Sequence, residues 1–428
     1  MPEVVPVFLV ITALIAWFNA RYLKLPSTIG VMAAALLLSA ATLVLDYFGV
    51  GRPREYAAEL FGVIDFSDVL MQGMLSILLF AGALHVDLQR LARYRWQVGL
   101  LAVCGTLAAA LLIGLGLYYL LPLAGLPLPL AYCMVFGALI APTDPVSVTG
   151  LLRKVGAPPD LETVISGESL FNDGVGIVLF AVMATIAAEH HAPGGIETAA
   201  LLLREAVGGI VYGLVLGAVT YQMLKSIDSY QEEVLLTVAA VLGGYSLAHV
   251  LGVSGPLAMV AAGILIGNRG RRKAMSDHTR EQLDQFWELL DSMLNAVLFV
   301  LIGFEALVLP FSTNLFVAGL IAIGVALAAR LLTAGLPVAA LGSRSGLPRG
   351  AWQVLTWGGL RGGISVALAL SLPHGAWRDA LVTITYIVVV FSVLVQGLSV
   401  ERLVRRLVPC SGAGHAQEGE DRSSSSLP

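Results

Sequence analysis

The sequence predicts an all-α polytopic membrane protein. Hydrophobic residues make up 57% of its 428 residues, charged residues only 13%, and the mean hydropathy is +0.84. Soluble domains carry about 25% charged residues, so this chain has too few charges to cover a water-facing surface. Its apolar residues form continuous runs and lack the alternation that is typical of a membrane β-barrel.

Thirteen apolar windows, each about 20 residues long, predict thirteen transmembrane helices. The ninth window is short, and the third begins among Asp65 and Asp68, so the limits of these two are approximate. The windows cover residues 4–23, 27–49, 67–86, 98–121, 128–152, 161–188, 200–224, 231–251, 254–268, 287–309, 313–340, 351–373 and 379–400.

The basic residues predict the orientation of these spans. With the N-terminus outside, nineteen of the 25 lysines and arginines fall on the inner side and four on the outer side, while Arg330 and Arg361 lie within spans. Basic residues accumulate in cytoplasmic loops. We therefore expect an outside N-terminus and a cytoplasmic C-terminus in the plasma membrane, which is the inner membrane if the source is bacterial. Residues 401–428 are predicted to be a short cytoplasmic tail whose low-complexity end is disordered.

Two of the spans are predicted to be interrupted. The fifth contains Pro142-Thr143-Asp144-Pro145, and each proline removes a backbone donor and obstructs the preceding turn. The twelfth contains the run GGLRGG at residues 358–363, whose glycines give a helix little support. The two spans are seven apart and so cross in opposite directions. Opposed broken helices indicate the inverted repeats of a secondary transporter, with its site at the midplane where they cross.

A third feature precedes the tenth span. Residues 276–290 mix charges with apolar residues at helical spacing, among them Leu283 and Trp287. This pattern predicts an amphipathic helix that lies at the cytoplasmic interface and leads into the tenth span.

Ionisable residues inside the spans are the candidates for function, because such groups are costly in a bilayer. Ser169 and Asp173 share one helical face and Glu168 and Asn172 share another, whereas Glu168 and Asp173 diverge by roughly 140°. The oxygens around Asp173 suit a hard cation. Glu168 instead needs a cationic partner, either Arg330 or Arg361.

The break in the fifth span adds Asp144 and Thr143. Carbonyls freed at such a break coordinate cations in transporters. Thr143 could supply its carbonyl or hydroxyl to an ion, or could cap a helix, and both interpretations remain open. His85 and Glu305, near predicted span ends, are expected to be solvated.

Several classes of function are excluded. The net charge of −4 gives no basic footprint for nucleic acid. There is no GxxxxGK[ST] loop, so nucleotide-driven transport within this chain is not expected. No Ser/His pair or HExxH lies in any span, which argues against an intramembrane enzyme, and no cofactor is expected. Polar groups gather at one depth rather than along a pore, which argues against the alternative of a gated cation channel.

The motifs APTDPVSVTGLLRKVGAP (141–158), GESLFNDGVGIVLF (167–180) and TWGGLRGGISVALAL (356–370) resemble those of the monovalent cation:proton antiporter-1 family, of the prokaryotic NhaP type. The resemblance covers residues 4–400. An Asn-Asp pair, here Asn172 and Asp173, is typical of this branch, whereas an Asp-Asp pair is typical of its electrogenic relatives.

The resemblance implies specific roles for the candidate residues. Asp173 would carry cation and proton in turn, with Ser169 and Thr143 as further Na⁺ ligands and with Asn172 and Asp144 lining the site. Glu168 would pair with a buried arginine, Arg330 as first choice and Arg361 as second.

The resemblance also implies architecture and activity. Family members are homodimers in which a core bundle moves against a dimerisation bundle in an elevator-like cycle. Here these bundles would comprise residues 98–190 with 313–400, and 1–97 with 200–310. The expected activity is electroneutral exchange of one Na⁺, often Li⁺, for one H⁺, which serves pH homeostasis. A K⁺/H⁺ antiporter on the same scaffold is the alternative, because one oxygen cage suits either cation.

Overall fold

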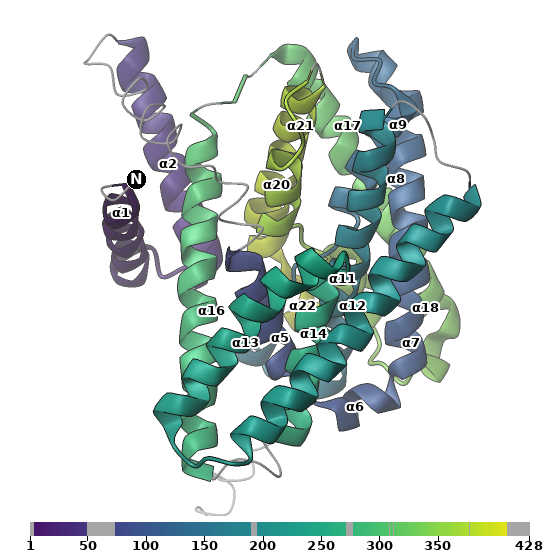
Figure 1. Ribbon diagram of the computed structural model, residues 1–428. Coiled ribbons are helices and arrows are strands. Elements are labelled where there is room, and N and C mark those ends of the chain that lie inside the picture. Colours follow the sequence, from purple (N-terminus) through teal and green to yellow (C-terminus); the bar gives the residue numbers. More distant parts are fainter. Residues whose placement is uncertain are drawn as a thin grey trace, which may run out of the picture.

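The computed structural model shows a bundle of helices, with no strand among the residues it describes (Figure 1). These are residues 4–48, 73–189, 195–270, 277–307, 309–310, 312–375 and 377–408. The α-helices are α1 Val4–Phe18, α2 Ser27–Tyr47, α5 Leu75–Leu84, α6 Leu88–Arg93, α7 Arg95–Gly99, α8 Thr106–Leu120, α9 Leu130–Ile140, α10 Val146–Lys154, α11 Pro159–Glu189, α12 Gly195–Leu224, α13 Tyr230–Leu251, α14 Gly255–Leu265, α16 Asp277–Glu305, α17 Thr313–Arg330, α18 Leu336–Leu341, α19 Ala351–Trp357, α20 Gly363–Leu370, α21 Arg378–Phe391 and α22 Gly397–Leu407.

Within the described part of the chain, nine helical stretches are long and apolar enough to cross a membrane. Four predicted spans are not among them. The third is represented by the short apolar helix Leu75–Leu84, the ninth by Gly255–Asn268, and the fifth and twelfth by broken pairs of helices. Asp65 and Asp68 lie outside the described residues. The all-helical membrane architecture is therefore confirmed, and the count of thirteen crossings stays a prediction.

Both predicted interruptions are present. α9 ends at Ile140 and α10 begins at Val146, so the two prolines lie in the irregular segment between them. α19 ends at Trp357 and α20 begins at Gly363, so the first five residues of GGLRGG form the second irregular segment. Local sequence explains both, because proline and glycine remove the donors or the restraint that keep a helix regular.

The predicted helix at 276–290 is present from Asp277 onward and leads into the tenth span as expected, and its apolar face packs on protein. The segment is the first half of one continuous helix, α16, which contains no proline or glycine before Gly303. Leu283 and Trp287 are fully buried. Trp287 donates a hydrogen bond from Nε1 to Thr237 Oγ1 (3.2 Å), and its ring centroid lies 4.8 Å from that of Phe80. The apolar face of this segment is therefore covered by protein instead of lipid headgroups.

The helix at the end of the last span is also longer than predicted. α22 continues past residue 400 to Leu407, with Val400 and Val404 buried against α10 and α19. Glu401 and Arg405, one turn apart on its exposed face, form an ion pair at 3.0 Å. The predicted tail therefore begins with folded helix. The rest of that tail, 409–428, lies outside the described residues.

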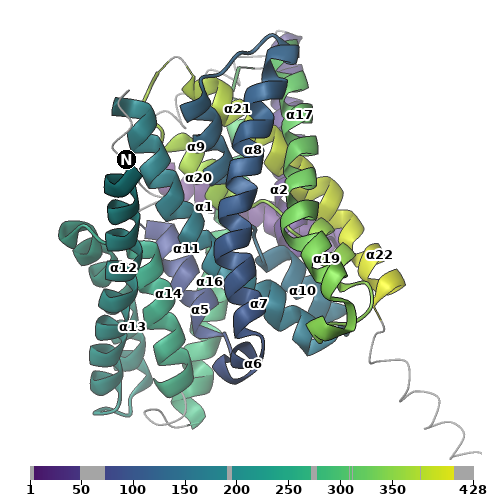
Figure 2. The same cartoon turned by 90° about the vertical axis from the view of Figure 1, so that its right-hand side faces the viewer.

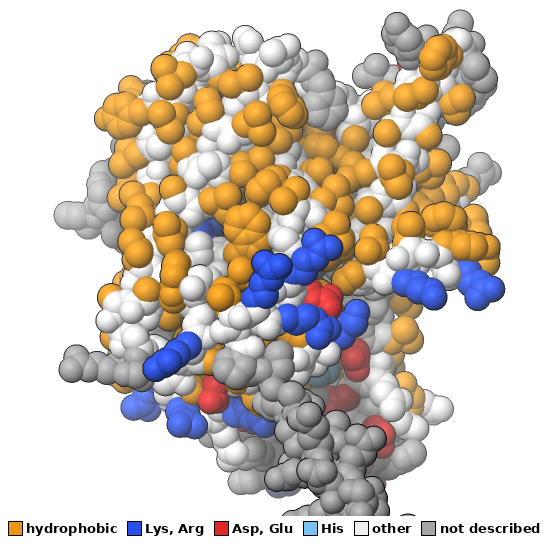
Figure 3. Space-filling view, turned by 180° about the vertical axis from the view of Figure 1, so that it is seen from behind, with side chains coloured by type: hydrophobic (Ala, Val, Ile, Leu, Met, Phe, Trp, Pro, Cys, Tyr) orange, Lys and Arg blue, Asp and Glu red, His pale blue; other side chains and the backbone are white. Residues whose placement is uncertain are grey.

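The helices pack in two groups. α8, α9, α11, α17, α20 and α21 pack on one another, as do α2, α5, α12, α13, α14 and α16. Figure 1 shows α16 beside α2, with α8 and α9 across the molecule, and Figure 2 shows α12 and α13 together at the edge opposite α19 and α22. In Figure 3, hydrophobic side chains cover the upper and middle parts of the surface, and charged side chains gather below them. This distribution is that of a protein surrounded by lipid.

Replacement of Trp287 by alanine tests the buried position of the first half of α16. We expect W287A to lower the free energy of unfolding by about 3–5 kcal/mol, because a large buried side chain and its hydrogen bond are lost. Thermal unfolding in detergent measures this. W96A is the matched control, since the Trp96 side chain is 81% exposed. Equal, small losses for both variants would show that the segment lies at the interface.

Candidate ion-binding site

The two irregular segments meet and bond to each other. The backbone N–H of Asp144 donates to the carbonyl of Leu360 (2.8 Å). Arg361 Nη1 donates to the carbonyls of Ala141 and Pro142, both at 2.6 Å. These carbonyls follow the C-terminus of α9, where a helix has unpaired acceptors and a partial negative charge. Arg361 therefore satisfies the acceptors that the first break releases.

Two glycines of GGLRGG allow this close approach. A Cβ atom added to Gly362 would lie 2.5 Å from Asp144 Oδ2, and one added to Gly359 would lie 2.6 Å from Arg330 Nε. Both distances are far below van der Waals contact. The second break therefore needs glycine so that the half-buried Asp144 carboxylate and the buried Arg330 guanidinium can pass against its backbone.

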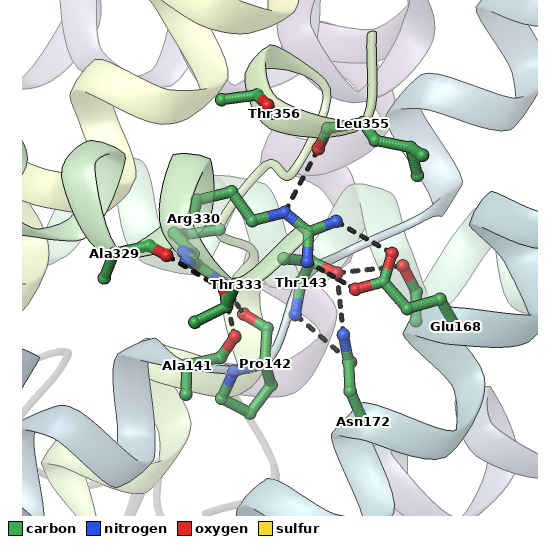
Figure 4. A network of polar contacts seen from close by, with 12 residues as sticks. Ala141, Pro142, Thr143, Glu168, Asn172, Ala329, Arg330, Thr333, Leu355 and Thr356 are labelled. Carbon is green, nitrogen blue, oxygen red and sulfur yellow. Dashed lines mark hydrogen bonds and ion pairs between the residues drawn. The ribbon is translucent and has the colours of Figure 1, made fainter. Parts of the chain in front are cut away.

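Glu168 pairs with Arg330, and both side chains are buried (Figure 4). Arg330 Nη2 donates to Glu168 Oε2 at 2.8 Å, and Nη1 donates to Oε1, which makes the pair bidentate. Arg330 Nε donates to the carbonyl of Leu355 (3.1 Å). The sequence left open whether Arg330 or Arg361 pairs with Glu168. In the structure the partner is Arg330, whereas Arg361 donates to backbone carbonyls.

Thr143 is held by two residues of α11, as Figure 4 shows in part. Its N–H donates to Asn172 Oδ1 (3.2 Å), and Asn172 Nδ2 donates to Thr143 Oγ1 (2.9 Å). The hydroxyls of Thr143 and Ser169 lie 3.0 Å apart and share a hydrogen bond. The Asn172 amide thus uses both of its ends to fix the first break against α11.

Asp173, the residue after Asn172, faces a cavity. It is 5% exposed and lines a cavity of about 600 Å³ together with Thr143 and Asp144. Within the described chain its carboxylate accepts no hydrogen bond, and the charges that act on it come from Asp144 and Arg361. A buried carboxylate in this setting is available to a proton or a cation.

The predicted site residues thus fall into two groups. Thr143, Asp144 and Asp173 line the cavity. The other five make contacts within the protein and are not among the described residues that line the cavity. Ser169 and Asn172 bond to Thr143, Glu168 pairs with Arg330, and Arg361 bonds to the carbonyls at the first break.

Sequence reasoning missed one wall of the cavity. Glu288, Asp291, Ser292 and Asn295 of α16 line it, and so does His85, which was expected to be solvated at a span end. The spacing of the four α16 residues, at i, i+3, i+4 and i+7, was a usable signal, because it places polar groups on one face of an otherwise apolar span. Lys24, Arg153 and Lys154 also line the cavity, and the basic-residue bias assigns all three to the cytoplasmic side.

Comparison with known proteins identifies the family. Residues 9–406 match the family described as "Sodium/hydrogen exchanger, transmembrane", and the chain belongs to it. It is 51% identical over 412 residues to the Na(+)/H(+) antiporter NhaP of Pseudomonas aeruginosa, covering 95% of this chain and 97% of the relative. It is 33% identical over 394 residues to the Na(+)/H(+) antiporter NhaH of Halobacillus dabanensis, covering 91% and 93%.

A solved structure shows the same fold. The sodium proton antiporter MjNhaP1 from Methanocaldococcus jannaschii superposes with a TM-score of 0.72 over 94% of this chain and 97% of that chain, at 21% identity. The predicted membership in the antiporter family is therefore confirmed. The chain is a multi-pass membrane protein with an antiporter fold.

Breaking the buried ion pair should destabilise the protein. We expect E168A to lower the free energy of unfolding by about 3–5 kcal/mol, because the Arg330 charge is stranded. R330A should behave alike, and the double variant should lose less than the sum of the two. Unfolding in detergent gives these values. A double-mutant cycle of Glu168 with Arg361 is the control. A coupling free energy in that cycle as large as the one between Glu168 and Arg330 would contradict the assignment.

Proposed function

We propose that this chain is a secondary antiporter that exchanges Na⁺, and also Li⁺, for H⁺, with Asp173 as the group that binds each in turn. The observation that carries the proposal is the Asp173 carboxylate itself, which is buried, lines the cavity and accepts no hydrogen bond from the described residues. Relatives whose names state Na(+)/H(+) antiport support the choice of ions.

Competition for one carboxylate explains obligatory exchange. A desolvated Asp173 holds a proton or a cation, and each displaces the other. The ionised, unoccupied site is costly to move through an apolar barrier, whereas the neutralised site is not. If the Asp173 site crosses the barrier only when a proton or a cation neutralises it, the transport of one ion requires the transport of the other in the opposite direction.

The residues beside Asp173 suit a hard monovalent cation. Thr143 and Asp144 line the same cavity, so a hydroxyl or carbonyl oxygen and a second carboxylate are at hand. Ser169 contributes its hydroxyl oxygen to the ion once this hydroxyl gives up its hydrogen bond with Thr143. Asn172 positions Thr143, and the ion pair of Glu168 with Arg330 joins α11 to α17.

The same proposal extends to architecture. Thirteen crossings arranged as inverted repeats place the two breaks at the midplane, and a core bundle of residues 98–190 and 313–400 moves against 1–97 and 200–310. The denser packing within each helix group than between the groups supports this division. The unit is a homodimer in the bacterial inner membrane, with its N-terminus outside and its C-terminus in the cytoplasm.

Removal of the Asp173 charge tests the exchange function. We expect D173N to fold and insert but to lose at least about tenfold in cation-driven proton flux, because an amide neither binds a proton nor neutralises a cation. Purified protein in liposomes is assayed with Na⁺, Li⁺ and K⁺ in turn. D379N is the matched control at an exposed aspartate. Flux in D173N near that of D379N would refute the carrier role, and flux with K⁺ alone would make the protein a K⁺/H⁺ antiporter.

Charge stoichiometry and pH form a second test of the same site. One titrating carboxylate, with Asn172 beside it, should exchange one proton for one cation and move no net charge. A voltage set with K⁺ and valinomycin should leave the final Na⁺ gradient unchanged. Apparent Na⁺ affinity should weaken as pH falls, because protons compete for Asp173, and should reach a plateau at high pH. A voltage-dependent gradient would instead require a second proton carrier, such as Asp144.

A further inference from the structure

Glu233 is a buried acidic residue that the exchange chemistry at Asp173 does not use. It is the fourth residue of α13, and its side chain is fully buried. It is not among the residues that line the Asp173 cavity. α13 packs on α12, α14, α16 and α5, in the helix group that does not carry Asp173. The environment of Glu233 is therefore separate from the proposed ion site.

Glu233 lies on the face of α13 that packs on the neighbouring helices. The buried residues of this helix recur every three or four positions, and they are Glu233, Thr237, Val241, Gly244 and Ala248. Thr237, one turn after Glu233, accepts the hydrogen bond from Trp287 of α16. In Figure 1 the start of α13 lies at the lower end of the molecule, close to the start of α16. Glu233 is thus one turn from a defined contact between these two helices.

Both carboxylate oxygens of Glu233 are without a hydrogen-bond donor. Oε1 and Oε2 are buried, and neither accepts a hydrogen bond within the described part of the chain. The hydroxyl of Ser229, just before the helix, bonds to the exposed Glu232 instead. An ionised carboxylate that is buried without a donor or a cation is far more costly than the neutral acid. The buried form of Glu233 is therefore the acid, with a proton on one oxygen.

No described positive charge compensates Glu233. The charge that acts on it is that of Asp228, a further carboxylate, in the turn between α12 and α13. α14 carries no ionisable side chain. The other ionisable groups at this end of the adjacent helices do not bond to Glu233, and they are Tyr221, Lys225, His85, Arg280, Glu281, Asp284 and Glu288. Both burial and the neighbouring charge thus oppose ionisation in the closed arrangement.

The position of Glu233 in the helix gives its carboxylate one short way to water. The first turn of α13 follows residues 225–229, which the basic-residue bias assigns to the cytoplasmic side. Displacement of this single turn exposes the carboxylate, whereas the rest of α13 can stay packed. Ionisation of Glu233 and release of the first turn are therefore coupled, because the charge is stable only where water reaches it.

We propose that Glu233 is a second proton-binding site, whose proton closes the first turn of α13 onto its neighbours. The protonated acid gives the closed arrangement of the structure, and the ionised carboxylate releases the turn towards the cytoplasm. The site responds to cytoplasmic pH and adds no transported proton, since Glu233 does not line the cavity of Asp173. This inference does not depend on the exchange function proposed above, and its test uses no transport.

The pH dependence of stability tests the proton site. Equilibrium unfolding in mixed detergent micelles is measured for the unaltered protein and for E233Q. Above about pH 5 the unfolded chain has an ionised Glu233, whereas the folded protein must keep the proton. The folded-to-unfolded ratio of the unaltered protein should therefore fall relative to that of E233Q, by about tenfold for each pH unit, and level off once folded Glu233 ionises.

Two comparisons make this measurement specific. E232Q is the matched control, because Glu232 is the adjacent carboxylate and is exposed, and its ratio should not show the tenfold dependence. The difference between the unaltered protein and E233Q should persist when both carry D173N, since independent sites are additive. Loss of the difference in that background would assign the proton to the Asp173 site and refute a second one.

Hydrogen exchange tests the release of the first turn. Protection of the backbone amides of residues 230–237, corrected for intrinsic exchange, should fall at alkaline pH in the unaltered protein and stay constant in E233Q. A pH-independent stability difference between the two proteins would refute the proton site, and unchanged protection would refute the release. If E233Q does not fold, E233L decides the matter, because leucine fills a similar volume and carries no proton. A pH dependence of stability in E233L equal to that of the unaltered protein would refute the proposal.

Discussion

The contact between the two irregular segments determines the rest of the site. At each break a membrane helix releases backbone groups that lipid cannot satisfy. Here each segment satisfies the other, through the bond from Asp144 N–H to the Leu360 carbonyl and through the two bonds from Arg361 to the carbonyls beyond α9. The breaks are stable because they coincide in space, and Asp144 is delivered to the cavity as a consequence.

α11 passes this crossing and connects it to Asp173, the proposed carrier residue. Its Asn172 and Ser169 side chains hold Thr143, and its Glu168 holds Arg330, so the faces of the helix that point into protein are occupied by defined bonds. Asp173, five residues after Glu168, points elsewhere and meets the cavity. Helical geometry alone thus places the ion-paired Glu168 and the cavity-lining Asp173 on different faces of one helix.

The two walls of the cavity have different origins. Asp144 lies between α9 and α10 and Asp173 lies on α11, and α9 and α11 pack with α8 and α20. Asp291 and Asn295 come from α16, which packs with α2 and α13. The cavity therefore lies between the two helix groups, and each of them contributes carboxylates to its lining.

The sequence by itself determined the membrane class, the positions of both breaks and the identity of the buried charges, because bilayer thickness, proline and glycine chemistry and the cost of intramembrane charge act locally. It could not choose between Arg330 and Arg361 as the partner of Glu168, since the partner lies 162 positions away and only packing brings the two together. It also could not show what packs on the apolar face of residues 276–290, because an amphipathic pattern does not reveal whether protein or lipid covers that face. The tertiary structure decided that question by burying Trp287 against Phe80, and in the same way it turned the polar face of α16 towards the cavity of Asp173.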